Sequence, residues 1–132
     1  MTPSRVTLIN PPSLPTVPGY SQVATVSTGD LVFVAGQVSL DASGAVVGIG
    51  DFGLQAAQTF QNLLSALEAA GCTATNLVKL TTFVTEMSQL PTFRSVRDRY
   101  LDPGHLPAST LVQVSRLFRP EFIIEIEAVA VR

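Results

Sequence analysis

The clearest periodic pattern in the chain lies between residues 51 and 70, where apolar residues recur every three or four positions. The repeat consists of Ala56, Phe60, Leu63, Leu67 and Ala70. A single apolar face at this spacing predicts an amphipathic helix. Asp51 is a suitable N-cap because its carboxylate can accept from the free N–H groups of the first turn. Gly71 suits the left-handed residue that follows a helix, so we expect the helix to end there.

A second, shorter helix is predicted to run to about Leu101. Ser88 or Thr92 is expected to cap its start, since both side chains can accept from a free backbone N–H. Its apolar face is formed by Phe93, Val96 and Tyr100. We expect this helix to lie on the same face of a sheet as the first one.

Apolar, β-branched runs predict strands in much of the remaining chain. These runs span residues 20–26, 31–36, 77–85, 109–117 and 122–131, and a short edge strand is expected at 45–47. The turn at 27–30 joins the first two strands into a β-hairpin. Residues 1–19 contain several prolines and should form an extended, mostly irregular arm. The order ββ(β)αβαββ predicts one α+β domain over residues 1–132, with both helices on one face of a single mixed sheet.

The last predicted strand carries apolar side chains on both of its faces. Ile123, Val129 and Val131 alternate with the residues expected to face the helices. Those residues are Phe122, Ile124, Ile126, Ala128 and Ala130. A sheet face that meets water is normally polar, and burying one Ile or Val side chain contributes about 1.5–3 kcal/mol. Composition agrees, because 46% of residues are hydrophobic and 14% are charged, with a mean hydropathy of +0.37. We therefore expect another copy of the chain to cover this face.

Charge and composition argue against several classes of function. The formal net charge of −2 and the single lysine, Lys79, disfavour a nucleic-acid binder and electrostatic capture by an anionic membrane. No apolar run approaches the roughly 20 residues that span a bilayer, and no signal-peptide core follows the N-terminus. Cys72 is the single cysteine and cannot form an internal disulfide, and with one histidine it cannot build the usual zinc site. These features indicate a cytoplasmic protein without a bound metal.

Two motifs that could carry chemistry have simpler interpretations. Residues 48–53 match GxGxxG before a helix, but the acidic residue expected about twenty positions later should end a strand. Glu68 lies within the predicted helix instead, so we interpret the motif as a glycine-rich turn and expect no cofactor. His105 lies in a Pro/Gly loop close to Ser109, but no third group that would orient it is identifiable. We interpret it as a surface-loop histidine.

Two sets of charged residues leave a structural and a functional interpretation open. Glu125 and Glu127 share one face of the last strand, where carboxylates are costly to bury unless they are paired. They could form a solvated or salt-bridged ladder with Arg116 or Arg97, or line an interface cleft and handle a water or a proton. The second helix contains three arginines, which are Arg94, Arg97 and Arg99. Such a cluster is normally a solvated face with local ion pairs, although Arg97 lies at the border of the apolar face and could bind a carboxylate.

Several short stretches run in a distinctive order from about residue 19 to the C-terminus. They are GYSQ at 19–22, LVFVAGQ at 31–37, QTFQNL at 58–63, VKLTTFV at 78–84, PAST at 107–110 and IEIEA at 124–128. In this order and spacing the chain resembles the RidA/YjgF family, also known as endoribonuclease L-PSP or translation-inhibitor proteins. The resemblance implies a chorismate-mutase-like fold and a homotrimer whose sheets form a central barrel. It also implies ligand clefts between subunits and hydrolysis of reactive imines and enamines, such as 2-aminoacrylate, without a cofactor.

Matched position by position, the resemblance assigns roles to individual residues. Tyr20 matches the tyrosine of the family's ligand cleft, and Ala35 and Gly36 match small residues whose backbone borders the ligand. Glu125 matches the acidic residue that positions or activates water. The resemblance therefore favours a cleft role for Glu125 over a solvated ladder.

Ser109 departs from the family pattern. Deaminating members read Pro-Ala-Arg where this chain reads Pro-Ala-Ser, and that arginine anchors the substrate carboxylate. A hydroxyl cannot replace it, because hydrogen bonds to charged groups contribute about 1.5–3 kcal/mol each. We expect an imine or enamine hydrolase of altered specificity, with Arg97 as a relocated cation and Leu111 as a further ligand contact. The alternative is a non-catalytic trimer that binds a metabolite or regulates a partner, whereas RNA cleavage does not fit an acidic chain with one histidine.

Overall fold

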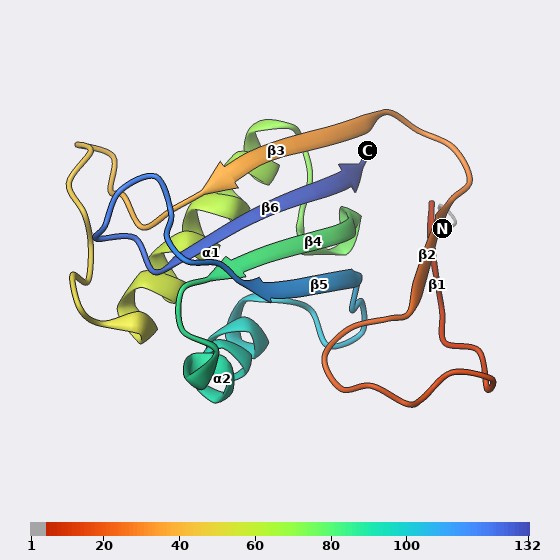
Figure 1. Ribbon diagram of the computed structural model, residues 1–132. Coiled ribbons are helices and arrows are strands. Elements are labelled where there is room, and N and C mark those ends of the chain that lie inside the picture. The colour runs from red at the N-terminus through yellow and green to blue at the C-terminus, as the bar shows by residue number, and fades with distance from the viewer. Residues whose placement is uncertain (1–4) are drawn as a thin grey trace.

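Four strands form the main sheet of the protein, in the order β3–β6–β4–β5 (Figure 1). They are β3 (Leu31–Gln37), β4 (Leu77–Val84), β5 (Ala108–Gln113) and β6 (Ile124–Val131). β6 runs antiparallel to both of its neighbours, whereas β4 and β5 are parallel, so the sheet is mixed. The structure is a computed structural model and describes residues 5–132.

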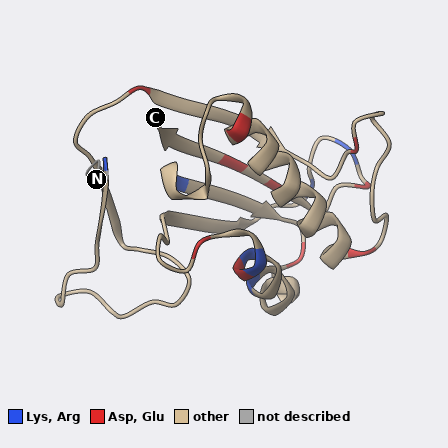
Figure 2. Ribbon diagram, turned by 180° about the vertical axis from the view of Figure 1, so that it is seen from behind, with Lys and Arg blue, Asp and Glu red and all other residues tan. Residues whose placement is uncertain are grey.

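Both helices pack on one face of this sheet, as Figure 2 shows from the helix side. α1 (Phe52–Ala69) begins and ends at the predicted signals. The Asp51 carboxylate accepts from a backbone N–H of the first turn at 3.1 Å, and Gly71, at φ +76°, follows the last turn. The N–H groups of Gly71 and Cys72 donate to carbonyls of that turn, which is the usual pattern at a helix that ends before glycine.

The start of the second helix differs from its prediction. Two short 3-10 helices, η1 (Ala74–Asn76) and η2 (Met87–Gln89), precede β4 and α2 (Leu90–Tyr100) respectively. Gln89 precedes α2 and makes no side-chain capping bond, while the Ser88 hydroxyl donates to the Glu86 carboxylate. Neither Ser88 nor Thr92 is therefore the cap, because the η2 backbone leads directly into the helix.

The core lies between the helices and the sheet, and aromatic rings form its centre. Phe60 of α1 is fully buried, with its ring centroid 5.7 Å from that of Tyr100 and 6.0 Å from that of Phe93. From β6 the buried residues of this core are Ile124, Ile126, Ala128 and Ala130. The helix periodicity and the strand alternation are thus confirmed. Phe122, predicted to share this face, is instead buried in a small separate cluster with Val38 and Leu117.

The predicted hairpin between residues 20–26 and 31–36 is wrong. β2 (Val23–Val26) pairs with β1 (Val6–Ile9) in a two-stranded sheet that lies apart from the main one (Figure 1). The cause is a tertiary anchor. The N–H of Ser21 donates to the carbonyl of Pro107 at 3.1 Å, and Ser21 forms a parallel bridge with Ala108 at the edge of β5. The start of β2 is therefore held at the sheet edge opposite to β3.

Other predicted boundaries differ for reasons of strand pairing. The arm is predicted to be mostly irregular, but residues 6–9 pair as β1. This is possible because the prolines of the described arm lie at 11–18, beyond that strand. Residues 1–4 lie outside the described residues. The edge strand expected at 45–47 is reduced to one bridge between Leu40 and Val46. β5 ends at residue 113 because its partner β4 ends opposite that position.

The face of the sheet that points away from the helices, which we call the open face, carries exposed apolar side chains. On β3, Phe33 is 74% exposed and Leu31 is 56% exposed, and Val112 is exposed on β5. Of the residues predicted for this face, Ile123 and Val129 are half-buried and Val131 is buried, so its exposed apolar surface comes from β3 and β5 instead. Its covering by another copy of the chain stays a prediction.

Candidate functional site

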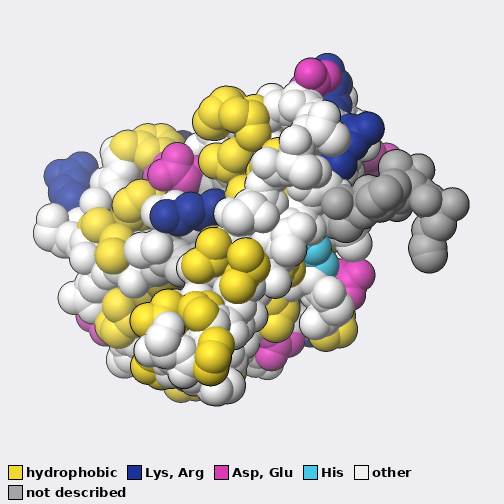
Figure 3. Space-filling model, turned by 90° about the vertical axis from the view of Figure 1, so that its right-hand side faces the viewer, with side chains coloured by type: hydrophobic (Ala, Val, Ile, Leu, Met, Phe, Trp, Pro, Cys, Tyr) yellow, Lys and Arg dark blue, Asp and Glu magenta, His cyan; other side chains and the backbone are white. Residues whose placement is uncertain are grey.

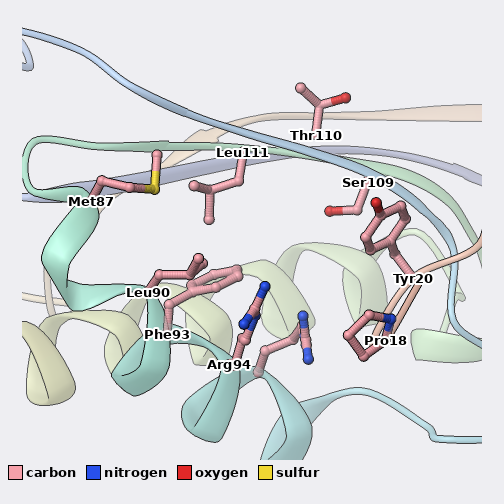
Figure 4. A pocket seen from close by; sticks show the side chains of 10 residues that line it. Pro18, Tyr20, Met87, Leu90, Phe93, Arg94, Ser109, Thr110 and Leu111 are labelled. Atoms are coloured by element: carbon pink, nitrogen blue, oxygen red, sulfur yellow. The ribbon is translucent and has the colours of Figure 1, made fainter. Parts of the chain in front are cut away.

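A cavity of about 370 Å³ lies between α2, the edge strand β5 and the arm, and we call it the α2 pocket. Ten residues line it: Pro18, Tyr20, Met87, Leu90, Phe93, Arg94, Arg97, Ser109, Thr110 and Leu111. Four of the residues predicted from the sequence meet here, namely Tyr20, Arg97, Ser109 and Leu111. Figure 4 shows Ser109 and Tyr20 at the end of the pocket opposite Met87.

Strand register and helix spacing place these side chains. In the parallel β4–β5 pair, Ser109 lies opposite Leu80 and Leu111 lies opposite Thr82, both of which are buried toward the helices. Ser109 and Leu111 therefore point to the helix side of the sheet edge. The hydrogen bond between Ser21 and Pro107 brings the neighbouring Tyr20 to the same edge.

Arg97 is the most constrained cation of the pocket. Its side chain is only 11% exposed, and its Nε and one terminal nitrogen each lie 3.0 Å from an Asp98 oxygen. The guanidinium carbon lies 5.9 Å from the centroid of the Phe93 ring. Gly19 has a φ of +82°, and a Cβ built there would overlap the guanidinium. Arg97 is thus held between the arm and α2, with part of its charge compensated by Asp98.

Arg94 is a pocket residue that the sequence interpretation missed as a ligand. It is exposed and lines the α2 pocket. Within residues 5–132 it takes part in no ion pair, so its charge remains available to a ligand. The spacing of Leu90, Arg94 and Arg97 places them on one helix face, and this signal could have identified Arg94. A guanidinium beside apolar side chains is suited to bind the carboxylate of a partly apolar molecule.

The other predicted residues meet on the open face. The β3–β6 register is irregular between Val34 and Gln37, so a bulge displaces Ala35 and Gly36 from regular pairing. A Cβ built at Gly36 would overlap a carboxylate oxygen of Glu125. Glycine is therefore required where the Glu125 carboxylate lies against the β3 backbone, and Glu125, Ala35 and Gly36 form what we call the Glu125 group.

The α2 pocket and the Glu125 group are separate within one chain. The pocket lies at the β5 edge on the helix side, whereas the Glu125 group lies on the open face where β3 pairs with β6. The structure thus brings the predicted residues together in two sets but does not unite the sets.

The environment of Glu125 changes its acidity. Burial raises the pKa of the Glu125 carboxyl above its usual value of 4.5, and the nearby negative charge of Glu127 raises it further. Within residues 5–132 neither Glu125 nor Glu127 forms a salt bridge with Arg116 or Arg97, because the arginine ion pairs go to Asp98, Glu121 and Asp30. The solvated form of the predicted ladder stays a prediction. A half-buried carboxyl without a cationic partner is a candidate for proton transfer.

The Glu127→Gln substitution is expected to lower the pKa of Glu125. It removes the repulsion by a second negative charge but leaves burial, the larger cause, in place, so the pKa stays above 4.5. A pH titration of side-chain carboxyl carbons by NMR measures this directly. Glu68→Gln, an exposed change on α1, is the matched control and should leave the Glu125 titration unchanged. An unchanged Glu125 pKa in Glu127→Gln would contradict the electrostatic account.

His105 and the glycine motif have structural roles. His105 is half-buried and not a surface histidine, since its Nε2 lies 2.7 Å from the carbonyl oxygen of Leu77 and ties its loop to β4. Gly48 and Gly50 have φ of +77° and +73° and form a turn before α1, as predicted. In the part of the chain that the structure describes, no three His, Cys, Asp or Glu side chains are grouped to hold a metal ion. None of the helices between residues 5 and 132 is long and apolar enough to cross a membrane.

Comparisons with known proteins identify the family. The family model described as endoribonuclease L-PSP matches residues 12–132. A RutC family protein of Synechocystis is 34% identical over 113 residues, which cover 85% of each chain. A rat 2-iminobutanoate/2-iminopropanoate deaminase is 35% identical, with 86% of this chain and 80% of that one covered. The crystal structure of YyfB, a Rid family protein of Yersinia pestis, superimposes with a TM-score of 0.88 at 34% identity and covers 97% of this chain and 99% of that one. The chain therefore belongs to the RidA/YjgF family.

Proposed function

We propose that the protein is a cytoplasmic homotrimer that hydrolyses 2-imino acids and their enamine tautomers to 2-keto acids and ammonia. The observation that carries this proposal is that one set of residues offers a cation for the substrate and the other offers a group for proton transfer. The α2 pocket offers a free guanidinium for a carboxylate, and the Glu125 group offers a carboxyl with a raised pKa. Relatives named as deaminases for 2-iminobutanoate and 2-iminopropanoate support the same reaction class.

The proposed reaction needs only water, a proton carrier and a charge anchor. Glu125 accepts a proton from water while the water oxygen bonds to the C=N carbon, and it then passes this proton to the nitrogen, which gives a carbinolamine. As the C–N bond of the carbinolamine breaks and its C=O bond forms, Glu125 carries the hydroxyl proton to the nitrogen, which leaves as ammonia. Positioned acid–base groups contribute about 10²–10⁴-fold to such steps. Tyr20 closes one end of the α2 pocket and orients the substrate.

The cations of the α2 pocket suggest a specificity different from that of family members with arginine at the Ser109 position. Here the cations come from α2, beside apolar side chains. Those side chains are Met87, Leu90, Phe93 and Leu111. We propose that Arg94, assisted by Arg97, binds the carboxylate, and that 2-imino acids with larger apolar side chains fit better than 2-iminopropanoate.

An amino-acid oxidase that generates imino acids in situ provides the test. Purified protein should accelerate keto-acid release, and the acceleration should be larger with leucine or methionine than with alanine as the oxidase substrate. Equal acceleration for all three would contradict the specificity. If keto-acid release is not accelerated for any amino acid, the proposed hydrolase activity is contradicted.

A non-catalytic binding role is the alternative. It is favoured by one observation, namely that the α2 pocket of a single chain contains ligand-binding groups but not Glu125. Calorimetric binding of a 2-keto acid, together with no acceleration in the oxidase assay, would favour this alternative.

A further inference from the structure

The β1–β2 hairpin lies beside the main sheet, and β2 is not paired with β3, the partner that the sequence pattern predicts for it. In the part of the chain that the structure describes, β1 pairs with β2, and this small sheet lies beside the end of the main sheet (Figure 1). Ile9 and Val23 are exposed on this hairpin. Figure 3 shows hydrophobic side chains in several groups at this end of the molecule. Within residues 5–132, no third strand continues this small sheet.

The outer edge of β3 is open in the same way. β3 is the first strand of the main sheet, and among the described strands it pairs with β6 alone. Its residues Leu31 and Phe33 are largely exposed. An edge strand with free backbone groups and apolar side chains is a template for another strand. The hairpin and the β3 edge are therefore complementary surfaces.

The anchor at Ser21 prevents β2 from pairing with β3 of its own chain. Ser21 is bridged to β5, whereas β3 lies at the opposite edge of the sheet. Three strand spacings of about 4.8 Å separate those edges by about 14 Å. Val23 is two residues from Ser21, and two extended residues span only about 7 Å. At its far end the segment is fixed as well, because Asp30 and Arg132 exchange two backbone hydrogen bonds of 3.0 Å.

We propose that the β1–β2 hairpin of each copy adds to the β3 edge of the next copy by antiparallel pairing of β2 with β3. We take for this pairing the register that a hairpin turn at residues 27–30 would give, so that Val26 lies opposite Leu31 of the next copy and Ala24 lies opposite Phe33. Each copy donates one hairpin and accepts one. This contact is heterologous, and it gives the proposed trimer when each copy is rotated by one third of a turn relative to the one before it.

This exchange would unite the two sets of site residues, a consequence that rests on the proposed function. In the proposed register Ser21 of one copy lies opposite Gly36 of the next, and Tyr20 lies beside that position. The α2 pocket that contains Tyr20 would therefore meet the Glu125 group of the neighbouring copy. A single chain has both halves of the site, but they would face each other only between copies.

Disulfide cross-linking tests the exchange without reference to activity. One version of the chain carries Ala24→Cys and a second version, with a tag of different mass, carries Phe33→Cys. The two versions are co-expressed and oxidised. Opposed residues on paired strands have Cβ atoms about 4.5–5.5 Å apart, close enough to cross-link. We expect a disulfide between the two versions. A chain with both changes should form chain-to-chain links and not an internal one. Ser13→Cys, in the exposed loop beyond β1, is the matched control and should not link to Phe33→Cys.

Three outcomes would overturn the exchange. They are an internal disulfide in the doubly changed chain, links only between two Phe33→Cys chains, and no link at all. Hydrogen exchange on the unchanged protein adds a second measurement: outward amides of residues 31–34 should be protected in the assembly and lose protection on dilution to single chains. Rapid exchange of those amides in the assembly would also overturn the proposal. Cross-links without imine hydrolysis would contradict the proposed function alone, and hydrolysis without cross-links would contradict the exchange alone.

Discussion

Glu125→Gln is expected to lower kcat/KM for imino-acid hydrolysis by about 100-fold or more, within the range found for loss of a positioned acid–base group. Glutamine keeps the size of the side chain and its contact with Gly36 but cannot accept a proton from water. Steady-state rates in the oxidase-coupled assay measure this loss. Substrate affinity should change little, because the carboxylate anchor lies in the α2 pocket.

Glu127→Gln is the matched control for this prediction. It removes a carboxylate two residues away on the same strand, and at pH 8 its kcat/KM should stay within a few-fold of the unchanged protein. A retained rate in Glu125→Gln would show that water is activated by another group.

The raised pKa of Glu125 also makes the stability of Glu125→Gln informative. A carboxyl with a raised pKa binds its proton more tightly in the folded chain than in the unfolded one. At pH values between the pKa of Glu125 in the unfolded chain and its higher pKa in the folded chain, the unfolded chain therefore holds fewer protons. The free energy of unfolding falls as pH rises through this range. Glu125→Gln abolishes this dependence, so its unfolding free energy at neutral pH should equal or exceed that of the unchanged protein. A loss of activity can then be separated from unfolding.

Arg94→Gln is expected to raise the KM for an apolar imino acid by at least about tenfold, since a charged hydrogen bond contributes about 1.5–3 kcal/mol and 1.4 kcal/mol corresponds to tenfold. Arg97→Gln should have a smaller effect on KM, because Asp98 already compensates part of the Arg97 charge. Calorimetric titration with a 2-keto acid provides a second measure of the same anchor.

Arg99→Gln is the matched control for the anchor. Arg99 is exposed on the same helix but does not line the α2 pocket, so its loss should leave KM and ligand affinity unchanged. Equal affinities in Arg94→Gln and Arg99→Gln would mean that the carboxylate is bound elsewhere.

Local signals predicted some elements well because the interactions that form them are local. Asp51 and Gly71 fix the ends of α1 through hydrogen bonds within one turn. The hairpin prediction failed because the turn at 27–30 carries no information about the hydrogen bond from Ser21 to Pro107, more than eighty positions away along the chain.

The candidate site was predicted in part for a similar reason. The family resemblance identified Glu125 and Gly36, but their contact depends on the bulge in β3, which strand alternation alone does not reveal. Arg94 was interpreted as part of a solvated helix face. Its role as a pocket residue became visible only when β5 and the arm were placed beside α2.

Mixing two inactive variants tests most directly whether the site is shared between copies. Chains with Glu125→Gln keep the cations of the α2 pocket, and chains with Arg94→Gln and Arg97→Gln keep Glu125. The two variants are unfolded together and refolded in equal amounts. Each interface then draws its α2 pocket and its Glu125 group from two chains at random, so about one quarter of the interfaces combine an unchanged pocket with an unchanged Glu125. Activity should then return to about one quarter of that of the unchanged protein. A mixture no more active than the two variants measured separately would contradict a site formed between copies.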